Sequence, residues 1–255
     1  MRETRVLIVG ATALACGLAM RLRADCTVIE SGYGAGAEFA DAMRADPIDL
    51  AKERAPLTEA LAEELFERNA ISRKGEPHIP GFAGAFAKRF RASGCRLLLG
   101  TRVTGVERLE NGFSVTLFQP QEGYSEILAE QVVNTEPQKF MDCRKTFSLM
   151  LTDGVPDIGS GTNPSLLHGR FAEESILTFD VPQSCTLPQA QRMADEWLTA
   201  HRDLLRGAKV AGPALVFGYR FASAVDVMRD GVRYVPSASF PDAVSAFEGG
   251  EILCL

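Results

Sequence analysis

The feature that most constrains this chain is an apolar strand that ends in glycine and passes directly into a helix of small residues. Residues 6–9 (Val-Leu-Ile-Val) form a continuous apolar run, as expected of a strand buried on both faces of a parallel sheet, and Gly10 closes it. Residues 11–23 are rich in Ala and Leu and predict a closely packed helix. A second apolar run, residues 27–29, ends at Glu30. This order predicts a β-α-β unit, and therefore an α/β fold with a parallel sheet.

The same stretch permits a second interpretation. Arg2 and Arg5 precede the apolar residues 6–20, which is the arrangement of a secretory signal peptide. The run continues without a break into Arg21-Leu22-Arg23 and then into the next apolar strand, which is not typical of a cleaved signal. We therefore favour the β-α-β interpretation. No other stretch of the sequence approaches the roughly 20 apolar residues that a membrane span needs.

Charge and cysteine content narrow the functional classes. With 27 basic and 33 acidic residues the formal net charge is −6, which disfavours nucleic acid as a partner, because affinity for it comes from neutralising phosphates. The 6 cysteines and 3 histidines show no metal-ligand spacing, so we predict no metal site. Isolated cysteines are typical of a reducing compartment, and we expect a cytoplasmic protein without a membrane partner.

The rest of the chain alternates between helical and strand-like patterns. Helices are expected at residues 49–70, 82–92, 188–205 and 242–248. Short strands are expected at residues 95–99, 102–109, 113–118, 125–134, 147–151, 175–181, 215–217 and 233–235. Asn111-Gly112 is a strong hairpin signal. Because residues 130–134 return to the composition of a buried strand after this excursion, we expect two intertwined lobes rather than two sequential domains.

The turn after the first strand is a degenerate dinucleotide-binding motif. In that motif the first glycine makes the turn, the second admits the pyrophosphate, and an acidic residue about 20 positions on binds the ribose. Gly10 holds the first position, and Glu30 lies 30 − 10 = 20 residues further on. Thr12 and Ala15 stand in place of the second and third glycines. Ala is an allowed substitute, and the Thr12 hydroxyl could donate to a phosphate oxygen.

Two interpretations of this turn follow. The first is a nucleotide site, in which a glutamate prefers a free 2′-hydroxyl and repels the 2′-phosphate of NADP. The second is an ordinary β-α-β unit, in which Gly10 only satisfies the turn and Glu30 is a solvated strand end. We favour the nucleotide site, because the turn follows a predicted strand, opens a predicted helix and precedes an acid that ends the next strand.

Residues 6–30 resemble the start of FAD-dependent oxidoreductases of the glutathione-reductase structural class, in which a Thr at the second-glycine position has precedent. Residues 82–92 and 94–106 are similar to the helix and strand pair ahead of the β-meander in that family. Residues 127–135 resemble the strand that re-enters its nucleotide domain. The resemblance spans residues 5–135 and rests on separated segments that occur in the same order.

The resemblance implies a Rossmann-like FAD/NAD(P)-binding fold with a parallel sheet, a β-meander and a small β-rich second lobe. On this basis residues 1–140 plus 232–255 form the FAD-binding domain, and residues 141–231 form a small substrate or cap lobe. The cofactor is then FAD. The implied cofactor-binding residues are Gly10, Ala11, Thr12, Ala13 and Leu14 around the pyrophosphate, Glu30 and Ser31 at the end of the second strand, and Val103 near the adenine.

The chain departs from the family at its C-terminal end. Family members carry a Gly-Asp segment there, and this sequence has no such dipeptide in its second half. The nearest substitute is the loop at residues 237–244, in which Asp242 opens a helix whose amino end could face a phosphate. We include Asp242 among the predicted cofactor-binding residues.

These observations predict an FAD-dependent oxidoreductase that transfers hydride between a small organic substrate and the flavin. The flavin itself carries this chemistry, so the catalytic residues stay unknown. Thr12, Ala15 and the missing Gly-Asp segment favour an alternative, a non-catalytic or scaffold subunit that retains a degenerate FAD-binding fold. A third reading is an NAD-binding Rossmann dehydrogenase. His168 with Arg170, and Arg220, are weak candidates for binding an acidic substrate.

The assembly state is the last expectation. A flavin site needs walls on both sides of the isoalloxazine, and residues 136–255 contain no recognisable flavin-capping motif. Residues 251–255 are largely apolar, so we expect them to dock as a strand on the core of the chain or to be buried against another chain. We therefore predict a homodimer, or a complex with a partner subunit.

Overall fold

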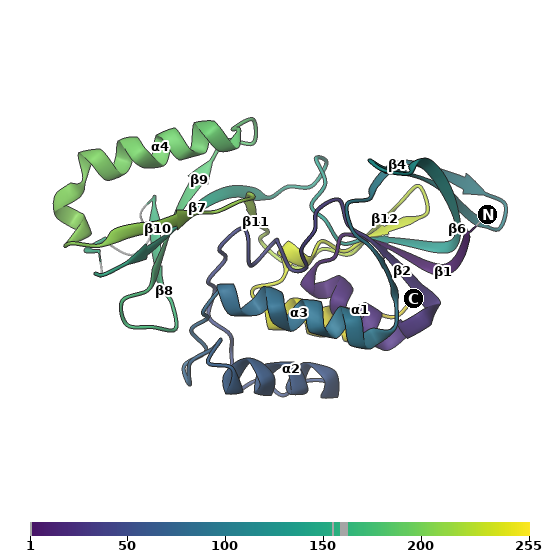
Figure 1. Cartoon of the computed structure of the whole chain (residues 1–255), viewed down its shortest axis with the longest axis horizontal. Coiled ribbons are helices and arrows are strands. Elements are labelled where there is room, and N and C mark those ends of the chain that lie inside the picture. Colours follow the sequence, from purple (N-terminus) through teal and green to yellow (C-terminus); the bar gives the residue numbers. More distant parts are fainter. Residues whose placement is uncertain (1, 155, 159–162) are drawn as a thin grey trace.

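A mixed, mainly parallel sheet forms the centre of the larger part of the molecule (Figure 1). The computed structural model describes residues 2–154, 156–158 and 163–255. The parallel strands lie side by side in the order β13 (Val232–Tyr234), β6 (Gly123–Asn134), β1 (Arg2–Val9), β2 (Cys26–Ile29) and β3 (Arg96–Leu98). β12 (Val227–Arg229) pairs antiparallel with β13 at the edge. This arrangement confirms the predicted Rossmann-like fold class.

A β-meander covers one face of this sheet. β4 (Arg102–Leu109) pairs antiparallel with β5 (Gly112–Gln119), and β5 pairs antiparallel with the first half of β6. β6 therefore belongs to both layers, because its second half runs parallel to β1. Side chains from the two layers form one core, in which Phe113 and Val115 of β5 pack with Leu7 of β1. The β-meander is thus confirmed.

Helices cover the opposite face of the sheet. They are α1 (Ala13–Leu22), α3 (Pro80–Ser93) and α5 (Ala243–Ile252), with α2 (Pro56–Glu67) outside them. α1 and α5 touch backbone to backbone at two glycines. A Cβ atom on Gly17 would lie 2.0 Å from the carbonyl oxygen of Phe247, and one on Gly250 would lie 1.9 Å from that of Leu14. Glycine is required at both positions, and the contact fixes α5 beside the first helix.

A second, antiparallel sheet forms the smaller part of the molecule. Its strands are β7 (Arg144–Thr152), β8 (Ser165–His168), β9 (Ser175–Val181), β10 (Lys209–Pro213) and β11 (Gly218–Arg220). They lie in the order β10-β7-β9-β8, and β11 also pairs with β7. α4 (Leu187–Ala200) packs on this sheet, with the Trp197 ring 5.9 Å from that of Phe179. This is the small β-rich lobe that the sequence predicted.

Several predicted boundaries are wrong. The helix expected at residues 49–70 begins only at Pro56, a residue suited to the first helical position because it lacks an N–H. The helix expected at 188–205 ends at Ala200 and is followed by a short 3-10 turn. Residues 215–217 do not form the expected strand and lie in the connection between β10 and β11. The Leu215 N–H donates to the carbonyl of Asp41, which is not part of the sheet.

The apolar residues 251–255 do not form the expected strand. Glu251 and Ile252 continue α5 instead, and the Ile252 side chain is 61% exposed.

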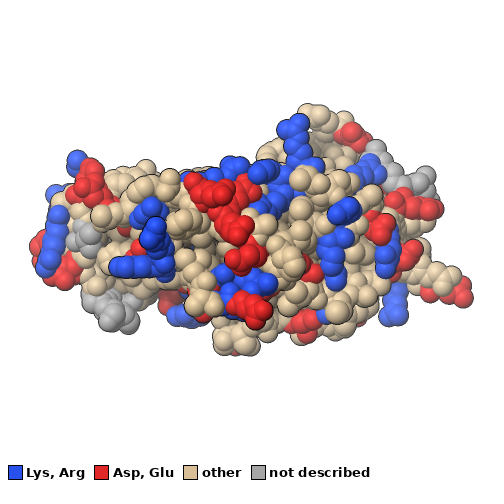
Figure 2. All heavy atoms as spheres, turned by 90° about the horizontal axis from the view of Figure 1, so that it is seen from below, with Lys and Arg blue, Asp and Glu red and all other residues tan. Residues whose placement is uncertain are grey.

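On the face of the molecule seen in Figure 2, basic and acidic side chains are intermingled. Over the part of the chain that the structure describes, no helix has both the length and the apolar character to cross a membrane.

Candidate functional site

The turn between β1 and α1 has the backbone that the sequence motif predicts. Gly10 adopts φ +92°, in the left-handed region that favours glycine. A Cβ atom there would lie 2.7 Å from Cγ of Glu136 and 2.9 Å from the Thr135 hydroxyl. The Gly10 N–H donates to the Ile29 carbonyl at 2.8 Å, which ties the turn to the end of β2. Gly10 is therefore required by both conformation and space.

The amino end of α1 is already satisfied by side chains of this chain. A helix leaves its first backbone N–H groups without helical partners, and these groups bind anions. Here four N–H groups of the turn and the first helical residues have side-chain acceptors: Glu30 Oε2 for Ala11 at 2.8 Å, Glu38 Oε1 for Ala13 at 2.8 Å, Ser237 Oγ for Leu14 at 3.2 Å, and Thr12 Oγ1 for Ala15 at 3.1 Å. Two of the four acceptors are carboxylates.

The Thr12 side chain is committed inside the turn. Its hydroxyl caps α1 and donates to the Thr135 hydroxyl at 2.8 Å, and only 6% of the residue is exposed. Thr135, directly after β6, donates in turn to the Val9 carbonyl at 2.8 Å. In this conformation the hydroxyl of Thr12 holds the ends of β1 and β6 together, rather than pointing outward.

Two carboxylates act on a third beside the turn. Burial, together with the charges of Glu30 and Glu38, raises the pKa of Glu136 from 4.5 to about 7. Burial also raises the pKa of Glu38, against the lowering effect of the Ala13 N–H and the Ser237 hydroxyl. Within residues 2–154, 156–158 and 163–255, no three metal-ligating side chains come close enough together to hold a metal ion. The turn is thus a site of concentrated negative charge.

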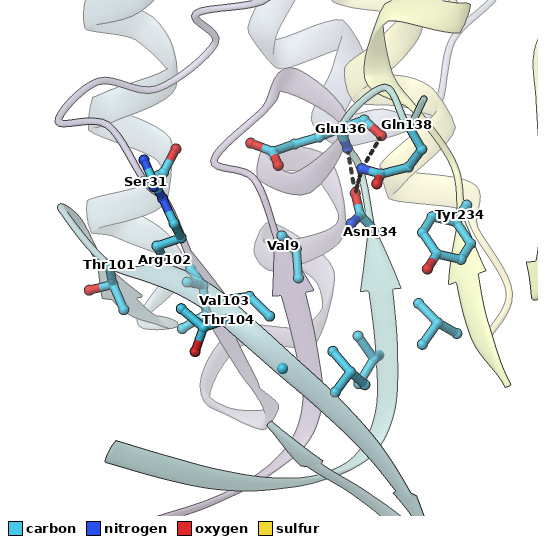
Figure 3. A pocket seen from close by; sticks show the side chains of 15 residues that line it. Val9, Ser31, Thr101, Arg102, Val103, Thr104, Asn134, Glu136, Gln138 and Tyr234 are labelled. Atoms are coloured by element: carbon cyan, nitrogen blue, oxygen red, sulfur yellow. Dashed lines mark hydrogen bonds between the residues drawn. The ribbon is translucent and has the colours of Figure 1, made fainter. Parts of the chain in front are cut away.

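A pocket of about 390 Å³ opens beside the turn, over the carboxyl ends of β1, β2 and β6 (Figure 3). Ligands of open parallel α/β sheets bind at this edge. Ser31 and Val103 line one side, and Asn134 and Tyr234 line the other. Figure 3 shows Glu136 at the end of β6, near the end of β1.

The structure brings most of the predicted site residues together. Gly10 to Leu14 form the turn, Glu30 bonds to its first N–H, and Ser31 and Val103 line the adjacent pocket. Asp242 lies apart from this group. Its carboxylate caps α5 by accepting from the N–H groups of Val244 and Ser245, both at 2.9 Å, and only 4% of the residue is exposed.

Sequence reasoning missed Glu38, Thr135 and Glu136, and within the loop at residues 237–244 it chose Asp242 rather than Ser237. Thr135 and Glu136 directly follow β6, and β6 was expected to return beside β1, so their position at the ligand edge was accessible from the sequence. Glu38 lies in an irregular segment, and Ser237 in a short 3-10 turn more than 200 residues from α1. Neither has a local pattern that indicates its role.

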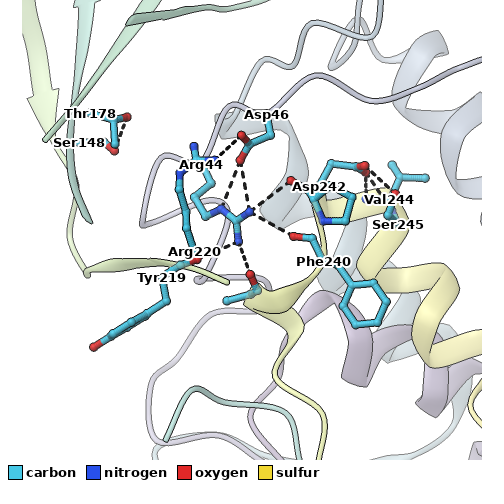
Figure 4. A network of polar contacts seen from close by, with 12 residues as sticks. Arg44, Asp46, Ser148, Thr178, Tyr219, Arg220, Phe240, Asp242, Val244 and Ser245 are labelled. Carbon is cyan, nitrogen blue, oxygen red and sulfur yellow. Dashed lines mark hydrogen bonds and ion pairs between the residues drawn. The ribbon is translucent and has the colours of Figure 1, made fainter. Parts of the chain in front are cut away.

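A buried arginine fixes the segment that carries Glu38 (Figure 4). Arg44 is 5% exposed and lies 4.7 Å from the centre of the Phe39 ring. Its guanidinium pairs with Asp46 at 3.3 Å and donates to backbone carbonyls of two distant segments, Tyr219 at 3.2 Å, Ala238 at 2.8 Å, Phe240 at 3.1 Å and Pro241 at 3.2 Å. Arg44 thereby joins this segment both to β11 and to the loop before α5.

The weaker candidates lie in the smaller lobe or near it. Arg220 is paired with Asp46 at 2.6 Å, close to Arg144 in a pocket of about 310 Å³. His168 ends β8 and is exposed. The Arg170 N–H donates to the Pro77 carbonyl at 3.0 Å, which joins the loop after β8 to the larger part of the molecule. None of these residues contacts the turn between β1 and α1.

Solved structures of flavoproteins share this fold. Glycine oxidase from Geobacillus kaustophilus superposes with a TM-score of 0.63 at 11% identity, over 98% of this chain and 93% of its own. A flavoprotein/dehydrogenase from Cytophaga hutchinsonii gives 0.58 at 13% identity, over 98% and 76%. The myxobacterial FAD-dependent halogenase CndH gives 0.62 at 10% identity, over 98% and 71%. No protein-family model and no curated protein matches the chain. At these identities the likeness establishes the fold.

Proposed function

We propose that this chain is an FAD-dependent oxidoreductase that transfers hydride between a small organic substrate and the flavin. The observation that carries the proposal is the pocket at the carboxyl ends of β1, β2 and β6, with Ser31 and Val103 in its wall. A nucleotide's adenosine is expected at this edge in a fold shared with flavoproteins. When bound, FAD would supply the hydride chemistry.

The residues present fit the adenosine half of that cofactor. Glu30 is held at the end of β2 by the N–H groups of Ala11 at 2.8 Å and Gly32 at 2.6 Å, and its oxygens keep lone pairs for ribose hydroxyls. Val9, Ile29 and Val103 offer apolar surface to a base. These side chains would bind and orient the nucleotide, and the meander strand β4 would shield it from water.

The diphosphate half fits less well in this conformation. Its expected donors are the N–H groups at the amino end of α1, and these already have acceptors in Glu30, Glu38 and Ser237. This observation favours a second candidate function, a non-catalytic or scaffold subunit that retains the fold. The two candidates differ in whether a flavin is bound and reduced.

Flavin binding tests the proposal. Purified protein is titrated with FAD and, separately, with adenosine, and the bound flavin is followed by its absorbance and by quenching of its fluorescence. We expect saturable binding of both ligands, mutual competition, and bleaching of the flavin by an amine, a hydroxy acid or NADH. Binding without bleaching by any donor supports the scaffold function. A protein that binds neither FAD nor adenosine contradicts the nucleotide site altogether.

A further inference from the structure

We propose that Glu38 occupies the position of the diphosphate at the amino end of α1, so that a dinucleotide binds only when this side chain is displaced. The inference rests on the proposed nucleotide site and adds a competitor that the chain itself carries. Its basis is direct, since Glu38 Oε1 accepts from the Ala13 N–H at 2.8 Å and from the Ser237 hydroxyl at 2.7 Å.

A carboxylate and a phosphate compete for the same donors. Both are anions with several acceptor oxygens, and both are stabilised by the positive end of a helix. Gly10 provides the tight turn through which a diphosphate would approach this end of α1. With Glu38 in place, the Ala13 N–H is no longer free, and the Ser237 hydroxyl that accepts from Leu14 also points its proton at Glu38.

Among the described residues, only one of the two carboxylate oxygens of Glu38 has hydrogen-bond partners, and this incomplete bonding lowers the free energy needed to displace the side chain. Its second oxygen, Oε2, is buried and has no hydrogen-bond partner within the part of the chain that the structure describes. Burial of a carboxylate oxygen without a partner opposes the contact. Two charges act on Glu38 in opposite directions: it repels Glu136, whose pKa its charge raises, and it is attracted by Arg44.

The backbone around Glu38 is fixed, so the side chain is the element that moves. Phe39 is 2% exposed in the core, and the Gly36 N–H donates to the Ala11 carbonyl at 2.8 Å. Arg44 holds the following residues through its carbonyl contacts (Figure 4). A rotation about the side-chain bonds of Glu38 frees the Ala13 N–H and leaves these anchors unchanged.

Four proteins and three ligands test this proposal. Adenosine, ADP and FAD are titrated by calorimetry into the wild type, Glu38→Ala, Glu38→Gln and Glu136→Gln, with circular dichroism and thermal unfolding as folding checks. Glu136→Gln is the matched control, because it removes one partly buried carboxylate from the same cluster, and no hydrogen bond joins that side chain to α1 among the described contacts.

The expected result is a gain in affinity that is confined to ligands that carry a diphosphate. Glu38→Ala should bind ADP and FAD at least about tenfold more tightly than the wild type, with adenosine affinity unchanged. The affinity of Glu38→Gln for ADP and FAD should lie between those of the wild type and Glu38→Ala, since its uncharged amide oxygen still reaches the Ala13 N–H. Glu136→Gln should gain less affinity for ADP and FAD than Glu38→Ala does, because it removes a charge that repels the diphosphate but does not free the Ala13 N–H.

Three outcomes overturn the proposal. If the wild type binds FAD stoichiometrically and folded Glu38→Ala gains nothing, Glu38 is not the competitor, while the proposed function stands. If Glu38→Ala gains equally for adenosine and ADP, the effect does not concern the diphosphate. If no folded variant binds any of the three ligands, both the competitor and the nucleotide site are wrong.

Discussion

At the scale of single residues, the raised pKa of Glu136 predicts how the stability of the protein changes with pH. Its pKa is raised from 4.5 to about 7, so the native state binds this proton more tightly than the unfolded state does, and stability falls as pH rises through that interval. Glu136→Gln stays neutral and should be more stable than the wild type at pH 8, by up to about 3 kcal/mol. At pH 4.5 the two proteins should be about equal.

Urea unfolding of both proteins at several pH values checks this prediction, because the difference between them isolates one group from the others that titrate. A stability difference that is constant from pH 4.5 to pH 8 would show that Glu136 does not titrate in this range.

Glu30 is expected to contribute directly to nucleotide affinity. In the proposed nucleotide site it would accept charge-assisted hydrogen bonds from the ribose, and such bonds are worth roughly 1.5–3 kcal/mol, or ~10–150-fold in affinity. Glu30→Ala should weaken adenosine binding by this factor, measured by calorimetry on protein that retains its circular dichroism spectrum. An unchanged affinity in the folded variant would mean that Glu30 only caps the turn through Ala11 and Gly32.

The residues that could be predicted from the sequence are those whose role is local. Gly10 and Glu30 belong to one β-α-β unit, where strand, turn and helix follow one another and spacing alone places the acid at the turn. Glu38 could not be predicted, because it reaches the turn through a loop without periodicity. Asp242 was predicted from a helix start, and the same residue type serves equally well as a cap for its own helix.

At the scale of elements, β2 and β3 place two thiols side by side. Thr27 of β2 pairs with Arg96 of β3 in these parallel strands. Cys26 and Cys95 directly precede these two residues and therefore also lie next to each other. A hydrogen bond from the Cys26 thiol lowers the pKa of Cys95 from 9.0 to about 7, and the pKa of Cys26 is raised by the same contact and by burial. Cys95 is only partly buried, so its thiolate is reachable by a reagent.

Alkylation should report this pair. The rate of iodoacetamide reaction at Cys95, followed by mass spectrometry, should be half-maximal near pH 7 in the wild type. In Cys26→Ala the midpoint should move upward toward 9.0, because the donor is lost. The exposed Cys254 monitors the reagent in the same spectra. An identical midpoint in the two proteins would disprove the coupling.

Among the elements, long apolar strands were predicted well and short edge strands were not. β4 and β9 have the expected bounds, since alternating or continuous apolar residues mark them. β8 and β12 were missed because four and three residues give no usable periodicity. The apolar residues 215–217 were mistaken for a strand, and the Leu215 N–H instead donates to the carbonyl of Asp41, far away in sequence.

At the scale of the whole molecule, Arg44 joins parts that are far apart in sequence. Replacing it by Met would leave four backbone carbonyls, those of Tyr219, Ala238, Phe240 and Pro241, without this donor. We expect Arg44→Met to destabilise the protein by about 3–5 kcal/mol. Arg220→Met, which removes a more exposed partner of the same Asp46, should cost no more than about 1 kcal/mol.

Chemical denaturation of the two variants gives this comparison, and equal losses of stability would show that Arg44 acts only through its ion pair with Asp46. The parallel sheet and the second, antiparallel sheet could be predicted from the order of strand types along the chain, whereas the contacts that hold the two together could not. The domain limits and the homodimer or partner subunit stay predictions, and light scattering at several concentrations tests the latter.

The contact between α1 and α5 has a consequence for how the protein is made. Residues 6–14 build the turn, but Ser237 and the helix that packs on Gly17 come from the region beyond residue 231. During synthesis the turn therefore emerges from the ribosome long before the side chain that completes it. Contacts of such long range slow folding, because closing the long loop between the two segments costs conformational entropy before the contact stabilises the chain. A nascent chain that stops before this region lacks Ser237, the acceptor of the Leu14 N–H, and the proposed nucleotide site is therefore incomplete until this region has been made.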